Sequence, residues 1–170
     1  WNVPFSSSAD SEIIAHMISN APANNWSDRA AYTMRKLQGA YSLVMMTKNE
    51  LIGMRDPLGV RPLCIGKLNE GWILASESCA LDHIGADLVR EINPGEAVLI
   101  DQNGPKTIYQ KKRTGKIGQC IFEQIYFSRP DSILREKLVY STRMAMGAEL
   151  SKEFPVDADI TPLLFSSSDS

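Results

Sequence analysis

Three cysteines are the residues through which this 170-residue chain could most directly perform nucleophilic, redox or metal chemistry. Cys64, Cys79 and Cys120 lie far apart, and none belongs to a CxxC pair of the kind that binds a metal or forms a redox dithiol. Because three thiols cannot all be paired, the sequence favours a reducing compartment over a disulfide scaffold. We interpret Cys64 and Cys79 as small buried hydrophobic residues. His16 and His83 have no partners at metal-ligand spacing and are interpreted as structural.

A carboxylate, Asp10, stands in the serine-rich segment Ser7–Glu12 (SSADSE), just before apolar residues that repeat at helical spacing. A short oxygen-bearing side chain at such a position can accept a hydrogen bond from a free backbone N–H of the first helical turn. The pattern predicts a helix at Ser11–Asn20 that is capped by Ser8 or Asp10. Taken alone, Asp10 is therefore interpreted as a capping residue.

The remaining patterns predict the elements that must position these groups. Helical periodicity indicates further helices at Ser27–Leu37, Glu77–Ile84 and Leu134–Phe154. Apolar runs bounded by turn residues indicate strands at Ala40–Met46, Leu51–Arg55, Leu63–Gly66, Trp72–Ser76, Ala97–Asp101 and Cys120–Phe127. The polar, basic stretch Gly104–Gly118 is predicted to be a linker or long loop. Several adjacent strands with helices, and no regular βαβ alternation, indicate an α+β layered fold.

Composition limits the classes of partner. The formal net charge is −2, and the short basic run Lys111–Arg113 is interpreted as a solvated loop, so nucleic acid is not an expected partner. No apolar stretch approaches the ~20 residues that span a bilayer, and Trp1–Ser8 has neither the basic segment nor the apolar run of a signal peptide. The start at Trp1 rather than Met and the low-complexity end Ser166–Ser170 are the first indications of a fragment.

Several segments, in a fixed order along the chain, carry a resemblance to a known family. They are SSADSE (Ser7–Glu12), RDPLGVRPLCIG (Arg55–Gly66), SES (Ser76–Ser78), INPGE (Ile92–Glu96), CIFEQIYFSRPDS (Cys120–Ser132) and FPVDADI (Phe154–Ile160). In this combination the chain resembles amidophosphoribosyltransferases over most of Ser7–Ile160. The SxDSE element also occurs, in loose form, in several class II glutamine amidotransferases. The YFSRPDS element discriminates, because glucosamine-6-phosphate synthases and asparagine synthetases do not carry it after their glutaminase domain.

The resemblance implies a two-stage enzyme of purine biosynthesis. An N-terminal glutaminase domain of the Ntn-hydrolase type, an αββα sandwich, releases ammonia from glutamine. A C-terminal phosphoribosyltransferase domain then uses that ammonia and phosphoribosyl pyrophosphate to make 5-phosphoribosylamine, the first committed step of de novo purine biosynthesis. By this resemblance, residues 1–113 correspond to the later part of the glutaminase domain. Residues 114–170 correspond to a linker and the first strand and helix of the transferase domain.

The resemblance implies that neither catalytic centre lies within these 170 residues. The family's nucleophile is a cysteine at the mature N-terminus, whose free α-amino group acts as the base, whereas position 1 here is Trp1. The family's oxyanion hole lies upstream of SSADSE, and its phosphoribosyl pyrophosphate loop does not occur before Ser170. We therefore expect no catalytic residue in this chain and predict that the chain alone is inactive.

The resemblance does assign roles to four residues. Asp10 matches the aspartate that binds the α-ammonium group of glutamine. Phe122 and Tyr126 match positions at the entrance of the ammonia passage and at the domain interface. As residues four apart on a strand they would share one face, and without the resemblance both would be interpreted as core. Cys120 matches the first of four thiolate ligands of a [4Fe–4S] cluster that one branch of the family contains.

The implied cofactors and partners belong to the full-length parent enzyme, and none is expected for this chain alone. They are Mg²⁺, the [4Fe–4S] cluster of that one branch, the substrates glutamine and phosphoribosyl pyrophosphate, and further copies of the enzyme in a homo-oligomer. The expected compartment is the cytoplasm, or the plastid for a plant protein. One alternative is a non-catalytic interaction module derived from the enzyme. Another is a different class II amidotransferase such as glucosamine-6-phosphate synthase, which YFSRPDS disfavours.

Overall fold

Two helices begin a fold that combines helices with antiparallel sheets, in agreement with the α+β expectation. The structure is a computed structural model that describes residues 4–111 and 117–155. Helix α1 covers Asp10–Ser19 and α2 covers Trp26–Lys36, close to the predicted positions. The side chain of Asn25 caps α2 by accepting a hydrogen bond from the backbone N–H of Asp28 at 2.8 Å.

The start of α1 differs from the predicted cap. Ala9 occupies the capping position and makes no side-chain bond there, so the expectation that Ser8 or Asp10 caps the helix was wrong. Glu12 instead reaches back and accepts hydrogen bonds from both backbone N–H groups and both hydroxyls of Ser6–Ser7. These donors lower the pKa of Glu12 to about 2, and the backbone N–H of Ser6 contributes most.

Two antiparallel sheets follow the helices. Sheet A has the strand order β1-β2-β6-β7, in which the strands are β1 (Ser42–Met46), β2 (Leu51–Arg55), β6 (Glu96–Asp101) and β7 (Gly104–Gln110). Sheet B has the order β4-β3-β5, in which the strands are β4 (Gly71–Ala75), β3 (Cys64–Leu68) and β5 (Asp87–Glu91). Because every neighbouring pair is antiparallel, short turns connect many of them.

Two of these strands lie where the sequence pattern predicted none. The linker prediction for Gly104–Gly118 was wrong for its first half, where β7 pairs with β6 across a tight turn. One side of β7 is solvent-exposed, while Ile108 and Tyr109 pack against the core, so the strand lacks a continuous apolar run. Strand β5 is an edge strand with half-exposed side chains, and for the same reason its sequence does not resemble a central strand.

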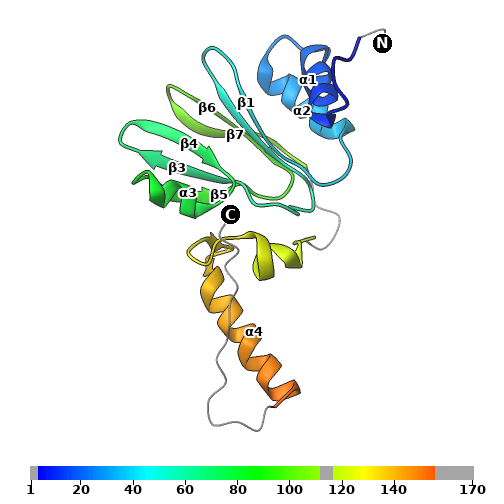
Figure 1. Cartoon of the computed structure of the whole chain (residues 1–170). Coiled ribbons are helices and arrows are strands. Elements are labelled where there is room, and N and C mark those ends of the chain that lie inside the picture. The colour runs from blue at the N-terminus through cyan, green and yellow to red at the C-terminus, as the bar shows by residue number, and fades with distance from the viewer. Residues whose placement is uncertain (1–3, 112–116, 156–170) are drawn as a thin grey trace.

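Three hydrophobic clusters hold the layers together. The first lies between helices α1 and α2 and sheet A, the second between the two sheets, and the third between sheet B and helix α3 (Ser78–His83). The layers therefore follow one another as helices, sheet A, sheet B and helix α3 (Figure 1). Buried members of the three clusters are, in that order, Met34 and Met54, Ile65 and Ile92, and Leu81.

The last part of the described chain forms a separate, mainly helical segment. It contains a short π-helix, a two-stranded hairpin and the long helix α4, which extends away from both sheets (Figure 1). The bounds are η1 (Glu123–Phe127), β8 (Ile133–Leu134), β9 (Lys137–Leu138) and α4 (Val139–Glu153).

The strand predicted at Cys120–Phe127 is not formed, and this part of the fold prediction was wrong. The backbone N–H of Ser128 instead donates to the carbonyl of Glu123 at 3.1 Å, a bond across five residues that is typical of a π-helix. None of the described strands pairs with this segment, and its backbone groups instead bond within a helical turn and to the side chain of Arg143.

The helix predicted at Leu134–Phe154 begins later, at Val139. Arg135 and Glu136 have φ values of +51° and +63°, which lie in the left-handed region and cannot continue a right-handed helix. They form the turn of the β8–β9 hairpin instead.

Candidate functional site

The connecting loop, Asp56–Pro62, joins β2 of sheet A to β3 of sheet B. Its conformation depends on Asp56, a fully buried residue whose carboxylate accepts backbone hydrogen bonds from Leu58 and Gly59 at 2.8 Å each and from Val60 at 3.0 Å. A buried carboxylate is costly unless such donors satisfy it. The loop is therefore fixed from within and offers a rigid surface to neighbouring segments.

Gly59 occupies the tightest point of the connecting loop. Its φ is +64°, and a Cβ atom there would lie 2.6 Å from Cγ of Pro94, in the turn that precedes β6. The backbone N–H of Gly95 in the same turn donates to the carbonyl of Asp56 at 2.8 Å. The two turns predicted from Asp-Pro-Leu-Gly and Asn-Pro-Gly therefore pack directly on each other.

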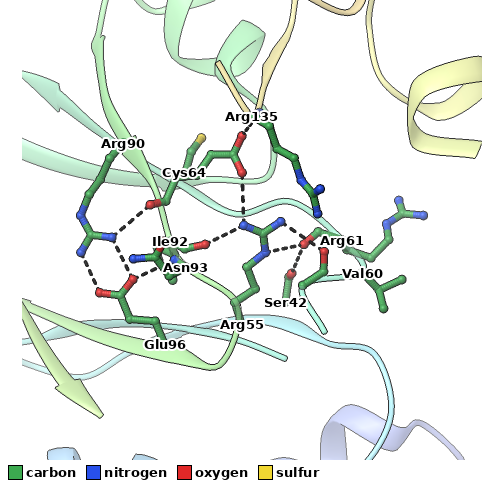
Figure 2. A network of polar contacts seen from close by, with 12 residues as sticks. Ser42, Arg55, Val60, Arg61, Cys64, Arg90, Ile92, Asn93, Glu96 and Arg135 are labelled. Atoms are coloured by element: carbon green, nitrogen blue, oxygen red, sulfur yellow. Dashed lines mark hydrogen bonds and ion pairs between the residues drawn. The ribbon is translucent and has the colours of Figure 1, made fainter. Parts of the chain in front are cut away.

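Arg55, at the end of β2, is a buried cation surrounded by oxygen acceptors (Figure 2). Its Nε donates to the carbonyl of Arg61 at 2.8 Å, and its Nη1 donates to the carbonyl of Ile92 at 2.6 Å. The same Nη1 lies 3.2 Å from the carboxylate of Glu91, and Nη2 donates to the carbonyl of Gly59 at 3.3 Å. The guanidinium thus ties the connecting loop to the end of β5.

Glu96, at the start of β6, is a second buried ionised group, and it connects the two sheets. Arg90 of β5 donates to both of its carboxylate oxygens at 2.9 and 2.8 Å. The hydroxyl of Thr107 and the backbone N–H of Asn93 donate to it as well. Burial by itself would raise the pKa of Glu96, but the hydrogen bonds from Arg90, Thr107 and Asn93 outweigh burial, and the pKa is lowered.

Two residues at the start of α3 form hydrogen bonds to the C-terminal segment that precedes α4. The carboxylate of Glu77 accepts hydrogen bonds from the backbone N–H of Arg129 at 3.0 Å and from the hydroxyl of Ser132 at 2.7 Å. The hydroxyl of Ser78 accepts the backbone N–H of Ile133 at 2.7 Å. The residues of the SES motif therefore bind the segment that carries the SRPDS motif. The bonded residues are 52 and 55 positions apart in the chain.

The connecting loop contacts the same segment through an ion pair. Nε of Arg61 lies 2.5 Å from Oε1 of Glu123, whose side chain is only 3% exposed. That oxygen accepts no hydrogen bond, so its contact with Arg61 is an ion pair only. The other carboxylate oxygen of Glu123 accepts the hydroxyl of Ser128 at 3.1 Å, and the guanidinium of Arg61 lies 4.8 Å from the ring centroid of Phe127.

A small cavity of about 10 Å³ lies at this junction, lined by Arg55, Glu91 and Glu123. Arg55 and Glu91 form one ion pair at this cavity and Glu123 forms another with Arg61, as in a structural junction between two parts of a molecule. Helix α4 is attached to the same junction, because Arg143 donates to the carbonyls of Gln124 at 2.8 Å and Ser128 at 2.7 Å.

The structure does not bring the four residues with assigned roles together. Asp10 is the exposed first residue of α1, a helix that packs on sheet A, whereas Cys120, Phe122 and Tyr126 belong to the segment around η1, on the other side of the sheets (Figure 1). Phe122 and Tyr126 still share a face, because residues four apart on helical turns lie on one side. Both are exposed, at 57% and 69%. With Ile121, Ile125 and Phe127 they form the η1 apolar surface.

Cys120 is a free, half-buried thiol just before η1. Within residues 4–111 and 117–155, no group of three or more cysteine, histidine or acidic side chains is arranged to hold a metal ion. Cys64 is also free but buried, and burial raises its pKa to about 12, with the nearby Glu91 adding to the effect. This agrees with the interpretation of Cys64 as a buried hydrophobic residue, whereas the same interpretation was wrong for Cys79, which is only partly buried.

Sequence reasoning assigned no role to the charged residues of the junction. Arg55 and Arg61 stand in the RDPLGVRP motif and Glu123 stands in the CIFEQIYFSRPDS motif, both of which indicate the family only, while Glu91 directly precedes the INPGE motif. One local signal is the presence of two arginines in a motif whose single acidic residue is Asp56, since a buried arginine needs an acidic partner.

Comparison with known proteins agrees with this architecture. Residues 2–83 match the family model described as a glutamine amidotransferase domain. An amidophosphoribosyltransferase of Synechocystis is 44% identical over 161 residues, and one of Rhizobium etli is 41% identical over 158 residues. These alignments cover 92% and 91% of this chain but 32% of each relative.

A solved structure matches as well. The glutamine phosphoribosylpyrophosphate amidotransferase of B. subtilis, complexed with ADP and GMP, superposes with a TM-score of 0.85 at 38% identity. The match covers 93% of this chain and 34% of that chain. Both kinds of match therefore extend beyond the glutamine amidotransferase domain and through the junction.

The layered fold and the match over residues 2–83 place the first part of the chain in the class of glutamine amidotransferase domains. More particularly, the chain belongs to the amidophosphoribosyltransferase family, as the motifs indicated. It spans about a third of the length of the relatives that it matches, 32% of two of them. Within the described residues, no helix is long and apolar enough to cross a membrane.

Proposed function

We propose that this chain is part of an enzyme that makes 5-phosphoribosylamine from glutamine and phosphoribosyl pyrophosphate, the first committed step of de novo purine biosynthesis. The observation that carries the proposal is the continuity of the match. Similarity to amidophosphoribosyltransferases covers 93% of the chain, well past the glutamine amidotransferase match at residues 2–83. A different class II amidotransferase would match in the first part and diverge after the junction.

The finer fold assignment is part of the proposal. Residues 1–113 would be the later part of an αββα Ntn-hydrolase sandwich, and the order of helices, sheet A, sheet B and helix α3 supports this. Residues 114–170 would be the linker and the beginning of the phosphoribosyltransferase domain. The position of η1, the β8–β9 hairpin and α4 outside the two sheets supports a separate unit there.

In this enzyme, Asp10 would bind the α-ammonium group of glutamine. The carboxylate is exposed at the first residue of α1, and the segment before it is held by the hydrogen bonds of Glu12. A carboxylate at this position can form a charge-assisted hydrogen bond with an ammonium group.

Phe122 and Tyr126 would contribute to the wall of the ammonia passage at the domain interface. An apolar wall favours neutral ammonia over ammonium, because the charged form is poorly solvated there. The exposure of both side chains is expected of residues that the remaining part of the enzyme covers.

Cys120 would supply one thiolate to a [4Fe–4S] cluster, and its free, half-buried thiol is compatible with that role. The other three thiolates, and the Mg²⁺ that accompanies phosphoribosyl pyrophosphate, would belong to the rest of the enzyme. The chain by itself would hold neither group, and its own chemistry is limited to positioning and binding.

The test compares the full-length enzyme that contains this segment with the 170-residue chain alone. The enzyme is expected to release pyrophosphate from phosphoribosyl pyrophosphate in a glutamine-dependent reaction that also forms glutamate. Failure of the full-length enzyme to do so would overturn the proposal. The chain alone is expected to catalyse neither half-reaction, and turnover by the chain would show that its own residues form a catalytic centre.

A second candidate function is a non-catalytic interaction module. The observation in its favour is the exposed apolar surface of η1 together with exposed residues of α4, such as Met144 at 48% and Leu150 at 55%. Light scattering on the purified chain tests it, since an interaction module should self-associate or bind the full-length enzyme. A monomeric chain that does not bind the full-length enzyme would exclude the interaction module.

The remaining assignments concern the assembled enzyme. We propose that it is a homo-oligomer in the cytoplasm, or in the plastid if the source is a plant. The three free cysteines support a reducing compartment.

A further inference from the structure

Glu91, at the end of β5, contacts two distant parts of the chain at once. Its Oε2 lies 3.2 Å from Nη1 of Arg55, and its Oε1 accepts the backbone N–H of Arg135 at 2.5 Å. Arg55 belongs to the sheets, whereas Arg135 is in the turn of the β8–β9 hairpin (Figure 2). One carboxylate therefore connects the sheets to the segment that leads into α4.

The side chain of Glu91 is held in place by Arg55. The Arg55 side chain is 5% exposed, and its other acceptors are the neutral carbonyls of Arg61, Ile92 and Gly59. Among the described residues, Glu91 is the only carboxylate that balances this buried cation. Because an uncompensated buried charge is strongly unfavourable, the pair restricts the carboxylate to the position from which it reaches the hairpin.

The hairpin depends on contacts of this kind. Two-residue turns with two positive φ values favour asparagine and glycine, but here the positions are Arg135 and Glu136, at +51° and +63°. Such a conformation persists when the surroundings hold it. Glu91 binds the turn, while Ser78 binds the other end of β8 through the N–H of Ile133 at 2.7 Å.

The hairpin in turn sets where α4 begins. Val139, the first residue of α4, follows β9 directly, is fully buried, and donates its backbone N–H to the carbonyl of Ser132 at 2.9 Å. A displacement of the hairpin would therefore move the start of α4 relative to the sheets.

We propose that Glu91 is a positioning residue that latches the β8–β9 hairpin to the sheets and thereby couples glutamine hydrolysis in one part of the enzyme to amination in the other. The inference rests on the proposed function. Ammonia made at one centre reaches the second without loss to water only if the two parts keep a fixed relative position. The latch is a contact between those parts that involves no substrate.

The latch itself is tested on the 170-residue chain by amide hydrogen exchange of residues 129–138. Glu91→Asp keeps a carboxylate near Arg55 but is too short to reach Arg135 as well, and Glu91→Gln removes the charge. Both are expected to accelerate exchange at the Arg135 amide by about tenfold or more, the effect of losing a hydrogen bond to a charged group. The matched control is Glu136→Gln, in the same turn but exposed, which should leave exchange unchanged.

Coupling is tested on the full-length enzyme by the ratio of glutamate formed to pyrophosphate released. The ratio is expected to be close to one in the unsubstituted enzyme and to rise at least about twofold in Glu91→Asp, because released ammonia escapes. Pyrophosphate release supported by added ammonium chloride should not change, which separates a positioning role from general damage to the transferase part.

Each outcome has one meaning. Faster exchange together with a raised ratio supports the proposal. Unchanged exchange in both Glu91 variants, or faster exchange with an unchanged ratio, overturns it while the proposed function stands. An unsubstituted enzyme without glutamine-dependent pyrophosphate release would instead overturn the proposed function.

Discussion

Two carboxylates of the SSADSE motif, Asp10 and Glu12, have different surroundings although only one residue separates them in the chain. Glu12 accepts four hydrogen bonds from Ser6–Ser7 and shapes the segment before α1. Asp10 is exposed and has no such partners among the described residues. The difference indicates that Glu12 is structural and that Asp10 is available for a ligand.

Replacing Asp10 by asparagine in the full-length enzyme should raise KM for glutamine by about 10- to 100-fold, the value of one charged hydrogen bond. Steady-state kinetics with glutamine as the varied substrate measures this. Activity with ammonium chloride should be unaffected, because Asp10 would contact glutamine only. Asp28→Asn, an exposed change on α2, serves as the control. An unchanged KM would exclude Asp10 from the glutamine site.

The three thiols should differ sharply in reactivity. Burial raises the pKa of Cys64 to about 12, so almost none of it is thiolate at neutral pH. Alkylation of the folded chain at pH 7 should modify Cys79 and Cys120, both half-buried, and modify Cys64 only after unfolding. Mass spectrometry of the digested protein reports the modified site. Equal labelling of Cys64 and Cys120 in folded protein would contradict the burial of Cys64.

At the scale of elements, local sequence explains the turn in the connecting loop, whereas packing explains the contact of this loop with a second turn. Its Asp-Pro-Leu-Gly sequence predicts a turn, and the turn is present with Asp56 as its internal acceptor. The packing of Pro94 over Gly59 is a contact between two turns, and neither turn predicts the other from its own sequence.

Gly59→Ala should therefore destabilise the chain more than the matched change Gly85→Ala. Both glycines have positive φ, at +64° and +72°, but a Cβ at Gly59 would lie 2.6 Å from Pro94, whereas nothing lies within 4 Å at Gly85. We expect a loss of about 1 kcal/mol at Gly85 from the backbone conformation alone. At Gly59, overpacking should add about 1–3 kcal/mol. Urea unfolding measures both, and equal losses would mean that the turns do not pack as described.

At the scale of the whole molecule, Glu96 is a contact that sheets A and B share. It lies on β6 of sheet A, and its main charged partner, Arg90, lies on β5 of sheet B. Because the folded-state pKa of Glu96 is lowered, its ionised form stabilises the fold. This contribution is present above the unfolded carboxyl pKa of about 4.3, and it is lost as the pH falls through the lower, folded-state pKa.

Glu96→Gln should lower the free energy of unfolding at pH 7 by about 1–3 kcal/mol, because the charged hydrogen bonds are weakened. The difference in free energy of unfolding between the two proteins should narrow below about pH 4, where Glu96 of the unsubstituted protein becomes protonated and its contribution is lost. Urea unfolding at a series of pH values measures the gap. Glu70→Gln, an exposed change between β3 and β4, is the control. A gap that stays constant down to pH 3 would contradict the role of the ionised form.

The sequence by itself determined the α+β class, helices α1 and α2, most strands of the two sheets, and the family. Those features depend on local patterns: apolar periodicity, turn residues and motif order. Strand β7 and edge strand β5 escaped prediction because each is half-exposed and lacks an apolar run. The segment Cys120–Phe127 has the apolar run of a strand, yet it is helical, since strand formation requires a neighbouring strand and none of the described strands is placed beside it.

The junction was decided only by the tertiary structure. Arg55 and Glu91 are 36 positions apart, and Glu91 and Arg135 are 44 apart, so no local pattern connects them. A charged side chain has the same appearance in a sequence whether it is solvated or buried against a partner. The partner becomes known when folding places two sheets and a hairpin around one carboxylate, because the energy of a buried charge depends on its neighbours in space rather than on its neighbours in the chain.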